Sequence, residues 1–231
     1  MEHPAWSPPE EMVRGANISA FMHWLGRERN LEFPDYDALW RWSVTDLDAF
    51  WCAVWDYFAI PSARPRGRAL ADPRMPGARW FPGVEMNYAE QVFRHATAER
   101  PAIVFRNEAG EDRELSWAEL EVRVGALAAS LRRMGIRRGD RVVAYLPNIP
   151  ETVIAFLAVA SLGAIWSVCS PDMGRVAVLD RFRQIEPRAM IAVDGYRYGG
   201  KAHDRRELVR ELLAGLPSVE HLVLLPGLDP R

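Results

Sequence analysis

Apolar residues recur with two different periods along the chain, and each period predicts a different kind of element. Between residues 47 and 58 the apolar positions are three and four apart, which places them on one face of a helix. They are Leu47, Phe50, Trp51, Val54, Trp55 and Phe58. Thr45 followed by Asp48 predicts a capping box at the start of this helix, and Pro61 comes shortly after its end.

The segment from residue 61 to residue 83 interrupts this helical pattern. It is rich in Pro, Gly and Arg, so it can sustain neither a helix nor a central strand, and we expect an ordered wrap or a linker. Seven of the nine Trp residues lie within the first 80 residues. We interpret them as core and interdomain packing rather than as a cofactor site. The change of composition near residue 85 predicts a helical region at 1–85 and a second region at 86–231.

The second region opens with a predicted hairpin and a long helix. Residues 102–105 and 113–117 are strand-like and flank a polar stretch, which suggests an antiparallel pair. Ser116 with Glu119 predicts a capping box at the start of the helix, and Gly135 closes that helix.

Continuous apolar runs separated by helical segments follow to the end of the chain. The runs predict strands at 140–146, 164–169, 189–194 and 221–225, with helices at 150–162, 176–185 and 204–216. This alternation indicates right-handed βαβ units in a parallel sheet with both faces covered. The predicted fold class is therefore α/β: a helical N-terminal cap region followed by a mainly parallel βαβ sheet.

Composition and charge exclude several classes of function. Hydrophobic residues make up 49% and charged residues 26% of the 231 residues, as in globular proteins. The formal net charge of −2 gives no electrostatic reason to expect a nucleic acid or an anionic membrane as a partner. The two cysteines, Cys52 and Cys169, are too far apart in the sequence for a disulfide framework or a CxxC metal clip.

No targeting or membrane signal is found in the sequence. The N-terminus lacks the basic and apolar regions of a signal peptide. The longest apolar run, residues 153–169, is broken by Ser161, Gly163 and Ser167, and it predicts a helix followed by a strand rather than a membrane span. We therefore expect a cytoplasmic protein.

Ligands of open parallel sheets lie at the carboxyl ends of the strands, so the loops after the predicted strands are the candidate sites. The loop at 194–204 contains Gly195, four residues, then Gly200 and Lys201, which fits the G-x-x-x-x-G-K spacing of a phosphate-binding loop. Ala202 stands where that motif needs a Ser or Thr hydroxyl for magnesium. Three interpretations stay open: a phosphate-binding loop, a solvated basic turn, or a surface grip on phosphate by Arg197 and Lys201.

The loop at 169–174 offers Cys169, Ser170 and Asp172. A nucleophilic cysteine needs a nearby histidine, and none of the five histidines sits directly at the end of another predicted strand. We favour a buried Cys169 and a helix-entry turn at the residues after it. The sequence has no HExxH, GxSxG or GxGxxG motif, so no metal site and no complete active site are predicted from the residues alone.

Several long segments resemble the acetoacetyl-CoA synthetase family of acyl-adenylate-forming, or AMP-binding, enzymes. They are residues 39–58, 79–90, 115–151, 161–174 and 193–205. The resemblance implies a ligase that joins acetoacetate to CoA using ATP and Mg²⁺. It also implies that residues 1–85 are the N-terminal region of acetyl- and acetoacetyl-CoA synthetases. Residues 86–231 are then part of the AMP-binding domain, its first α/β subdomain.

The resemblance further implies a role for individual residues. Arg197 matches an Arg that contacts the CoA nucleotide and its 3′-phosphate in the family, whereas Gly200 stands where relatives carry a second Arg, with Lys201 beside it. Ser170, Pro171 and Asp172 match the segment that lines the adenine pocket.

The ATP-handling parts of the family are expected outside this chain. The family's phosphate loop and catalytic Lys are expected beyond Arg231, so we expect no catalytic residue here, at most CoA as a ligand, and a missing C-terminal part as a partner. The alternatives are a non-catalytic CoA-binding or interaction module, a fragment of an acetyl- or other short-chain acyl-CoA synthetase, and a nucleotide hydrolase that depends on Lys201.

Overall fold

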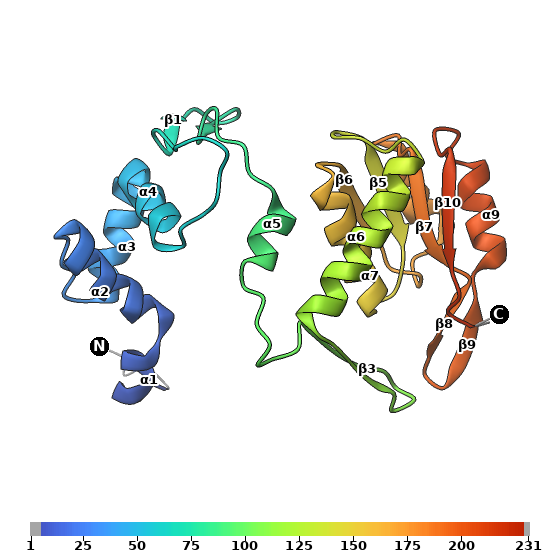
Figure 1. Cartoon of the computed structure of the whole chain (residues 1–231), viewed down its shortest axis with the longest axis horizontal. Helices are drawn as coiled ribbons and strands as arrows, with labels where there is room; N and C mark the ends of the chain where they lie inside the picture. The colour runs from blue at the N-terminus through green and yellow to red at the C-terminus, as the bar shows by residue number, and fades with distance from the viewer. Residues whose placement is uncertain (1–5, 229–231) are drawn as a thin grey trace. The chain divides into compact units, whose positions relative to one another are not determined.

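Helices come first along the chain and a parallel sheet comes second. The computed structural model describes residues 6–228, and the chain divides into two units, residues 1–86 and 87–231 (Figure 1). The first unit contains α1 (Glu10–Gly15), α2 (Asn17–Arg29), α3 (Tyr36–Thr45), α4 (Leu47–Tyr57), β1 (Leu70–Asp72) and β2 (Arg79–Trp80). None of the described helices is long and apolar enough to cross a bilayer.

The core of the first unit is small and surrounded by aromatic rings. Its buried members are Phe21, Leu25, Leu39 and Ala53, which come from α2, α3 and α4. The ring of Phe21 lies 5.0 Å from that of Tyr57, and partly buried rings of α2, α3 and α4 complete the cluster. Such edge-to-face pairs add to the burial of apolar area. Trp24 of α2 and Trp42 of α3 therefore serve packing within this unit, as the sequence indicated, whereas Trp40 of α3 is exposed.

The predicted N-cap of α4 is wrong. The N-cap lies one residue later in the chain, and it is a carboxylate rather than a hydroxyl group. Thr45 is the last residue of α3, and its hydroxyl donates a hydrogen bond to the carbonyl oxygen of Arg41 at 2.8 Å. Asp46 is the N-cap of α4, because its carboxylate accepts from the backbone N–H of Ala49 at 3.0 Å. A residue that is still helical cannot adopt the extended backbone of an N-cap, so Thr45 forms no capping box. Asp48 instead accepts from the backbone N–H of Leu70 at 2.8 Å.

The Pro- and Gly-rich segment at 61–83 is ordered, as expected. It forms the two-stranded antiparallel ribbon of β1 and β2, in which Leu70 pairs with Trp80. Asp56 of α4 is bound by the guanidinium groups of Arg66 and Arg29. Hydrogen bonding from Arg66 holds the pKa of Asp56 below its usual value.

The second unit is built around a parallel sheet. Its order across the sheet is β10 (His221–Leu225), β7 (Ala189–Val193), β5 (Arg141–Tyr145) and β6 (Ile165–Cys169), with every neighbouring pair parallel. Two antiparallel hairpins accompany it, β3 (Ile103–Arg106) with β4 (Asp112–Leu115), and β8 (Gly195–Tyr198) with β9 (Lys201–Asp204). The predicted α/β class, with helices followed by a mainly parallel sheet, is confirmed.

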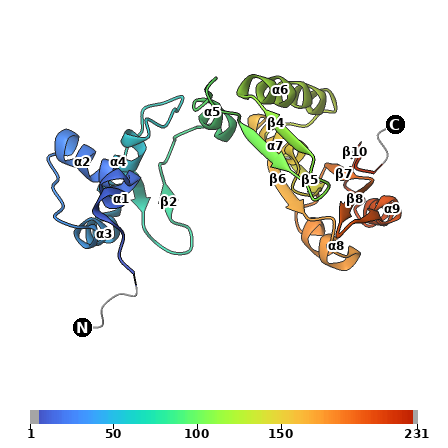
Figure 2. The ribbon, with the colours of Figure 1, turned by 90° about the horizontal axis from the view of Figure 1, so that it is seen from below.

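Helices cover both faces of this sheet (Figure 2). The helices of the unit are α5 (Tyr88–Phe93), α6 (Trp117–Arg133), α7 (Pro150–Ser161), α8 (Arg175–Arg183) and α9 (Arg206–Ala214). On β5, Val142 and Ala144 pack toward α6 and α7, whereas Val143 and Tyr145 pack toward α8 and α9. Successive strand residues point to opposite faces, so a continuous apolar strand is needed between two helical layers.

The predicted capping box of α6 is confirmed. The Ser116 hydroxyl accepts from the backbone N–H of Glu119 at 3.2 Å, and the Glu119 carboxylate accepts from the backbone N–H of Ser116 at 2.9 Å. Gly135 follows the helix with a φ of 85°, a conformation that suits glycine.

The prediction that both faces are covered holds for the inner strands and is wrong for parts of the outer ones. Every residue of β7 is buried. On the outer strands, Ile165 of β6 and Leu224 of β10 are about half exposed. A strand at the edge has neighbours on one side only, so its side chains are covered less completely within the described residues.

Candidate functional site

The chain order of the sheet creates a crevice at the carboxyl ends of β5 and β7. From β5 the chain passes through α7 to β6 on one side, and then through α8 back across to β7 on the other. Ligands of doubly wound sheets bind where the strand order reverses in this way. A cleft of about 460 Å³ lies here, lined by residues from 105–111, 147–149 and 193–198 and by Gly227.

The basic segment after β7 is a hairpin rather than a loop that leads into a helix. Gly199 and Gly200 form its turn, with φ values of 60° and 72°, and α9 begins only at Arg206. Positive φ at both central residues is the mark of a type I′ turn. Residues 195–201 therefore do not wrap a phosphate as a phosphate-binding loop would, and that alternative is wrong.

The register of this hairpin separates Arg197 from Lys201. Arg197 pairs with Ala202, and Lys201 pairs with Tyr198. Directly opposed residues of an antiparallel pair share a face and neighbours along a strand alternate, so Arg197 and Lys201 point to opposite faces. Arg197 is exposed and lines the cleft, and within residues 6–228 its side chain has no hydrogen-bond or ion-pair partner. Lys201 is also exposed but is not part of the cleft lining.

The segment Ser170–Pro171–Asp172 follows β6 and is anchored through its backbone. The carbonyl oxygen of Pro171 accepts from the Tyr145 hydroxyl at 2.7 Å and from Nε of Arg205 at 2.7 Å. Pro171 is buried, whereas Ser170 and Asp172 are exposed. A hydrogen bond from the Ser170 hydroxyl holds the pKa of Asp172 below its usual value, so this carboxylate is ionised at neutral pH.

Arg205 joins this segment to the hairpin, and sequence reasoning assigned it no role. Besides Pro171, its guanidinium donates to the Tyr196 hydroxyl at 3.1 Å, and its central carbon lies 5.1 Å from the centre of the Tyr196 ring. The other neighbour of that ring is His203, stacked at 5.0 Å. A guanidinium over a phenol ring is a favourable cation–π contact. Two of the predicted site segments, 170–172 and 195–204, are therefore brought together at one edge of the sheet.

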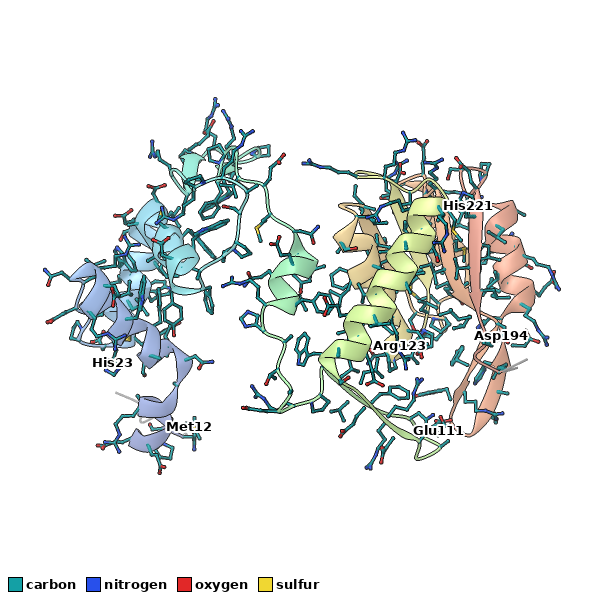
Figure 3. The ribbon with its side chains drawn as sticks, viewed as in Figure 1. Met12, His23, Glu111, Arg123, Asp194 and His221 are labelled. Carbon is teal, nitrogen blue, oxygen red and sulfur yellow. The ribbon has the colours of Figure 1, made fainter. Side chains whose placement is uncertain are left out.

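A buried carboxylate links the segments that follow β7 and β10. Asp194 directly follows β7, and its Oδ1 accepts from the backbone N–H groups of Gly227 at 2.7 Å and Leu228 at 2.9 Å. A Cβ on Gly227 would lie 2.1 Å from the carbonyl oxygen of Gly195, and a Cβ on Gly195 would lie 2.5 Å from the carbonyl oxygen of His203, so neither position has room for a side chain. Figure 3 shows Asp194 at the base of the β8–β9 hairpin. The last predicted loop, 225–230, is described only as far as residue 228.

Cys169 is not an activated nucleophile. Cys169 is 2% exposed, and burial raises the pKa of its thiol, so the thiol is neutral and shielded at pH 7. This confirms the interpretation of Cys169 as a buried apolar residue. Across residues 6–228, no three His, Cys, Asp or Glu side chains converge in a way that could hold a metal ion. The cleft offers the guanidinium of Arg197 as a cationic group that has no partner among residues 6–228.

Comparison with known proteins places this architecture in a family. The family model described as AMP-binding enzyme matches residues 89–229, which is more than half of the chain. The chain belongs to the AMP-binding enzyme family. A second model, described as acetyl-coenzyme A synthetase N-terminus, matches residues 36–92, which include α3, α4 and the β1–β2 ribbon.

Individual AMP-binding relatives are similar to almost the whole chain. Acetoacetyl-coenzyme A synthetase of Rhizobium meliloti (strain 1021) is 42% identical over 98% of this chain and 35% of its own length. Acetoacetyl-CoA synthetase of Rattus norvegicus is 37% identical over 98% of this chain and 34% of its own length. The structure of acetoacetyl-CoA synthetase from Streptomyces lividans matches with 45% identity and a TM-score of 0.95, over 100% of this chain and 36% of that one. The predicted resemblance is confirmed, and the chain spans about a third of the length of these relatives.

Proposed function

We propose that this chain forms the amino-terminal part of an ATP-dependent acetoacetate–CoA ligase. The supporting observation is the similarity to acetoacetyl-CoA synthetases, which extends over 98% of this chain at 42% and 37% identity. The proposed reaction converts acetoacetate, ATP and CoA into acetoacetyl-CoA, AMP and pyrophosphate. The proposal includes the division into a Trp-rich N-terminal region at 1–85 and part of the AMP-binding domain at 86–231.

The proposed chemistry has two steps. A carboxylate oxygen of acetoacetate attacks the α-phosphorus of ATP, and pyrophosphate leaves with the bonding electrons. The sulfur of CoA then attacks the acyl carbon, AMP leaves with the bonding electrons, and the thiol proton is released. Mg²⁺ neutralises charge on the phosphates when it is bound. The residues of this chain are assigned to neither bond change, and their proposed role is to bind and orient CoA.

The proposed CoA contact is Arg197. CoA carries about four negative charges on its phosphates at neutral pH. A guanidinium that lines the cleft and has no partner within residues 6–228 is free to form charge-assisted hydrogen bonds to such a phosphate. Ser170, Pro171 and Asp172 are proposed to border the adenine, because Arg205 ties their segment to the same hairpin.

Lys201 takes a lesser part in this proposal. It projects from the opposite face of the hairpin to Arg197 and does not line the cleft. One phosphate therefore cannot be held between the two side chains at the hairpin's observed register. Arg197 carries the main contact, and Lys201 adds only longer-range attraction, which falls off within a Debye length of about 8 Å at physiological ionic strength.

A calorimetric titration of the chain with CoA tests the proposed contact. Arg197→Ala is expected to weaken CoA binding by about tenfold, the effect of one charge-assisted hydrogen bond. Lys201→Ala is expected to have a smaller effect. Arg210→Ala is the matched control, because Arg210 lies on α9 and pairs with Glu207. Equal affinities of the wild type and Arg197→Ala would remove Arg197 from the site.

The ligase assignment is tested by assay and by the gene. With ATP, Mg²⁺, acetoacetate and CoA, the chain alone is expected to release no pyrophosphate, and measurable turnover would contradict its proposed role as a part. The coding sequence beyond the codon for Arg231 should continue in frame into a Ser/Thr/Gly-rich phosphate loop. A stop codon there would favour a non-catalytic CoA-binding module.

The acyl substrate is tested by comparing acids in the complete ligase. Acetoacetate is expected to support faster pyrophosphate release than acetate, and the opposite preference would favour the acetyl- or short-chain alternative. A cytoplasmic location stays a prediction.

A further inference from the structure

Two hairpins approach each other across the mouth of the cleft. The β3–β4 hairpin and the β8–β9 hairpin lie side by side in both ribbon views (Figures 1 and 2), and Figure 3 shows Glu111 at the end of the first one. Both hairpins contribute to the lining of the cleft. Contact between their ends therefore affects the shape of the candidate site.

The turn of the β8–β9 hairpin has two N–H groups that the hairpin itself cannot satisfy. Tyr198 and Lys201 form the last cross-strand pair, so the N–H groups of Gly199 and Gly200 lie outside the ladder. Both donate to the Glu108 carboxylate, Gly199 to Oε2 at 2.7 Å and Gly200 to Oε1 at 3.0 Å. Each carboxylate oxygen thus accepts one charge-assisted hydrogen bond from a residue more than 90 positions away.

The turn that carries Glu108 is itself well connected. The side-chain oxygen of Asn107 accepts from the backbone N–H groups of Ala109 and Glu111, each at 3.0 Å. The Asn107 amide also donates to the Glu111 carboxylate at 2.8 Å. These bonds fix the backbone on both sides of Glu108. Glu108 is therefore held by a stiff turn and reaches across to a turn made of two glycines.

We propose that Glu108 is a positioning residue that holds Arg197 at the cleft by binding the turn of its hairpin. Arg197 lies two residues before Gly199 on β8, so fixing the turn fixes the end of the strand that carries the guanidinium. A glycine turn without this contact has the widest conformational freedom of any turn. The choice of CoA as the ligand rests on the proposed function, whereas the contact between the hairpins does not.

Paired substitutions of Glu108 and Glu111 separate positioning from simple electrostatics. Both glutamates line the cleft, and changing either to Gln removes one negative charge from it. Electrostatics alone predicts that both variants bind the anionic ligand CoA more tightly. Positioning predicts opposite signs: Glu108→Gln weakens CoA binding by about three- to tenfold, because one of the two glycine N–H groups loses its acceptor. Glu111→Gln keeps a side-chain oxygen that can accept from the Asn107 amide, so the turn around Glu108 is retained and this variant binds CoA at least as tightly as the wild type.

The titration is accompanied by a measurement that needs no ligand. Amide hydrogen exchange at Gly199 and Gly200 is expected to accelerate in Glu108→Gln and to stay unchanged in Glu111→Gln. Unchanged exchange in Glu108→Gln overturns the proposal, and so does CoA binding by Glu108→Gln that equals or exceeds that of Glu111→Gln. A wild-type chain that binds no CoA overturns the proposed function instead, and the exchange rates then decide whether Glu108 holds the turn.

Discussion

The two units of the chain bury their apolar surface in different ways. In the second unit whole strands are enclosed, and all five residues of β7 are at most 1% exposed. In the first unit the central core cluster has only four buried members, Phe21, Leu25, Leu39 and Ala53, and partly exposed aromatic rings pack around it. Enclosed parallel strands end at one fixed edge of the sheet, and the loops of a binding site can be built on that edge. A cluster of aromatic side chains stabilises short helices but provides no comparable edge. The candidate site accordingly lies at strand ends in the second unit.

Polar side chains also have different roles in the two units. In the second unit, Tyr145 and Asp194 lie at the carboxyl edge of the sheet and fix the loops that follow other strands. In the first unit, Asp56 of α4 forms ion pairs with Arg29 of α2 and with Arg66 of the segment 61–83. Polar contacts therefore shape the candidate site in one unit and stabilise the fold in the other.

Replacing one buried phenylalanine in each unit should give the largest difference between the units in lost free energy of unfolding. Phe182 is fully buried between α8, α9 and the sheet, so Phe182→Ala is expected to lower the free energy of unfolding by about 3–5 kcal/mol. Phe21→Ala should cost less, about 2–3 kcal/mol, because its partly exposed neighbours can close over the gap. Urea unfolding followed by circular dichroism measures both losses. A larger loss for Phe21→Ala would contradict the contrast.

Removal of the Tyr145 hydroxyl should have an intermediate effect. The hydroxyl donates to the carbonyls of Pro171 and Met173, at 2.7 and 2.8 Å, so Tyr145→Phe is expected to cost about 1–3 kcal/mol at pH 8. Burial raises the pKa of Tyr145 from 10.0 to about 12. The unfolded chain therefore loses this proton first.

The sign of the pH dependence follows from that pKa. The advantage of the wild type over Tyr145→Phe is fully present below pH 10 and declines between about pH 10 and 12. Unfolding free energies of both proteins at pH 8 and pH 11 measure it. An advantage that grows over this range would show that the phenol is not held in its neutral form.

The smallest effect concerns the two candidate caps of α4 in the first unit. Asp46→Ala is expected to cost about 1 kcal/mol, because the N–H of Ala49 loses its acceptor. Thr45→Ala should change stability by less than about 0.5 kcal/mol, since its hydroxyl bonds within the last turn of α3. Thermal unfolding of the two variants provides the comparison. A larger cost at Thr45 would restore the capping box that the sequence predicts.

The sequence predicts the second unit well and the first unit less well for a physical reason. Each inner strand of the sheet is a continuous apolar run, and the cap of α6 is made within four residues, so both signals are local. In the first unit, α3 and α4 are joined by the single residue Asp46. Such a short break leaves the spacing of apolar positions almost undisturbed, so periodicity alone does not divide the two helices.

The candidate site is less predictable because its key contacts are distant in sequence. Glu108 meets Gly199 from 91 residues away, and Arg205 meets Pro171 from 34 residues away. No local pattern reports such pairs. The hairpin itself had a usable signal, because Gly199 and Gly200 between two short strand-like stretches are typical of a type I′ turn. The sequence also shows no reason to separate Arg197 from Lys201, since their separation depends on the register.

Hydrogen exchange of the whole chain with and without CoA tests most directly whether the strand ends of the second unit hold the ligand. Protection is expected in peptides that cover 195–205, 169–174 and 105–111, with no change in residues 6–86. At a CoA concentration near the Kd of the wild type, Arg197→Ala should show much weaker protection, as its roughly tenfold lower affinity requires. Protection confined to the first unit, or protection of the hairpin that is undiminished in Arg197→Ala, would contradict the account.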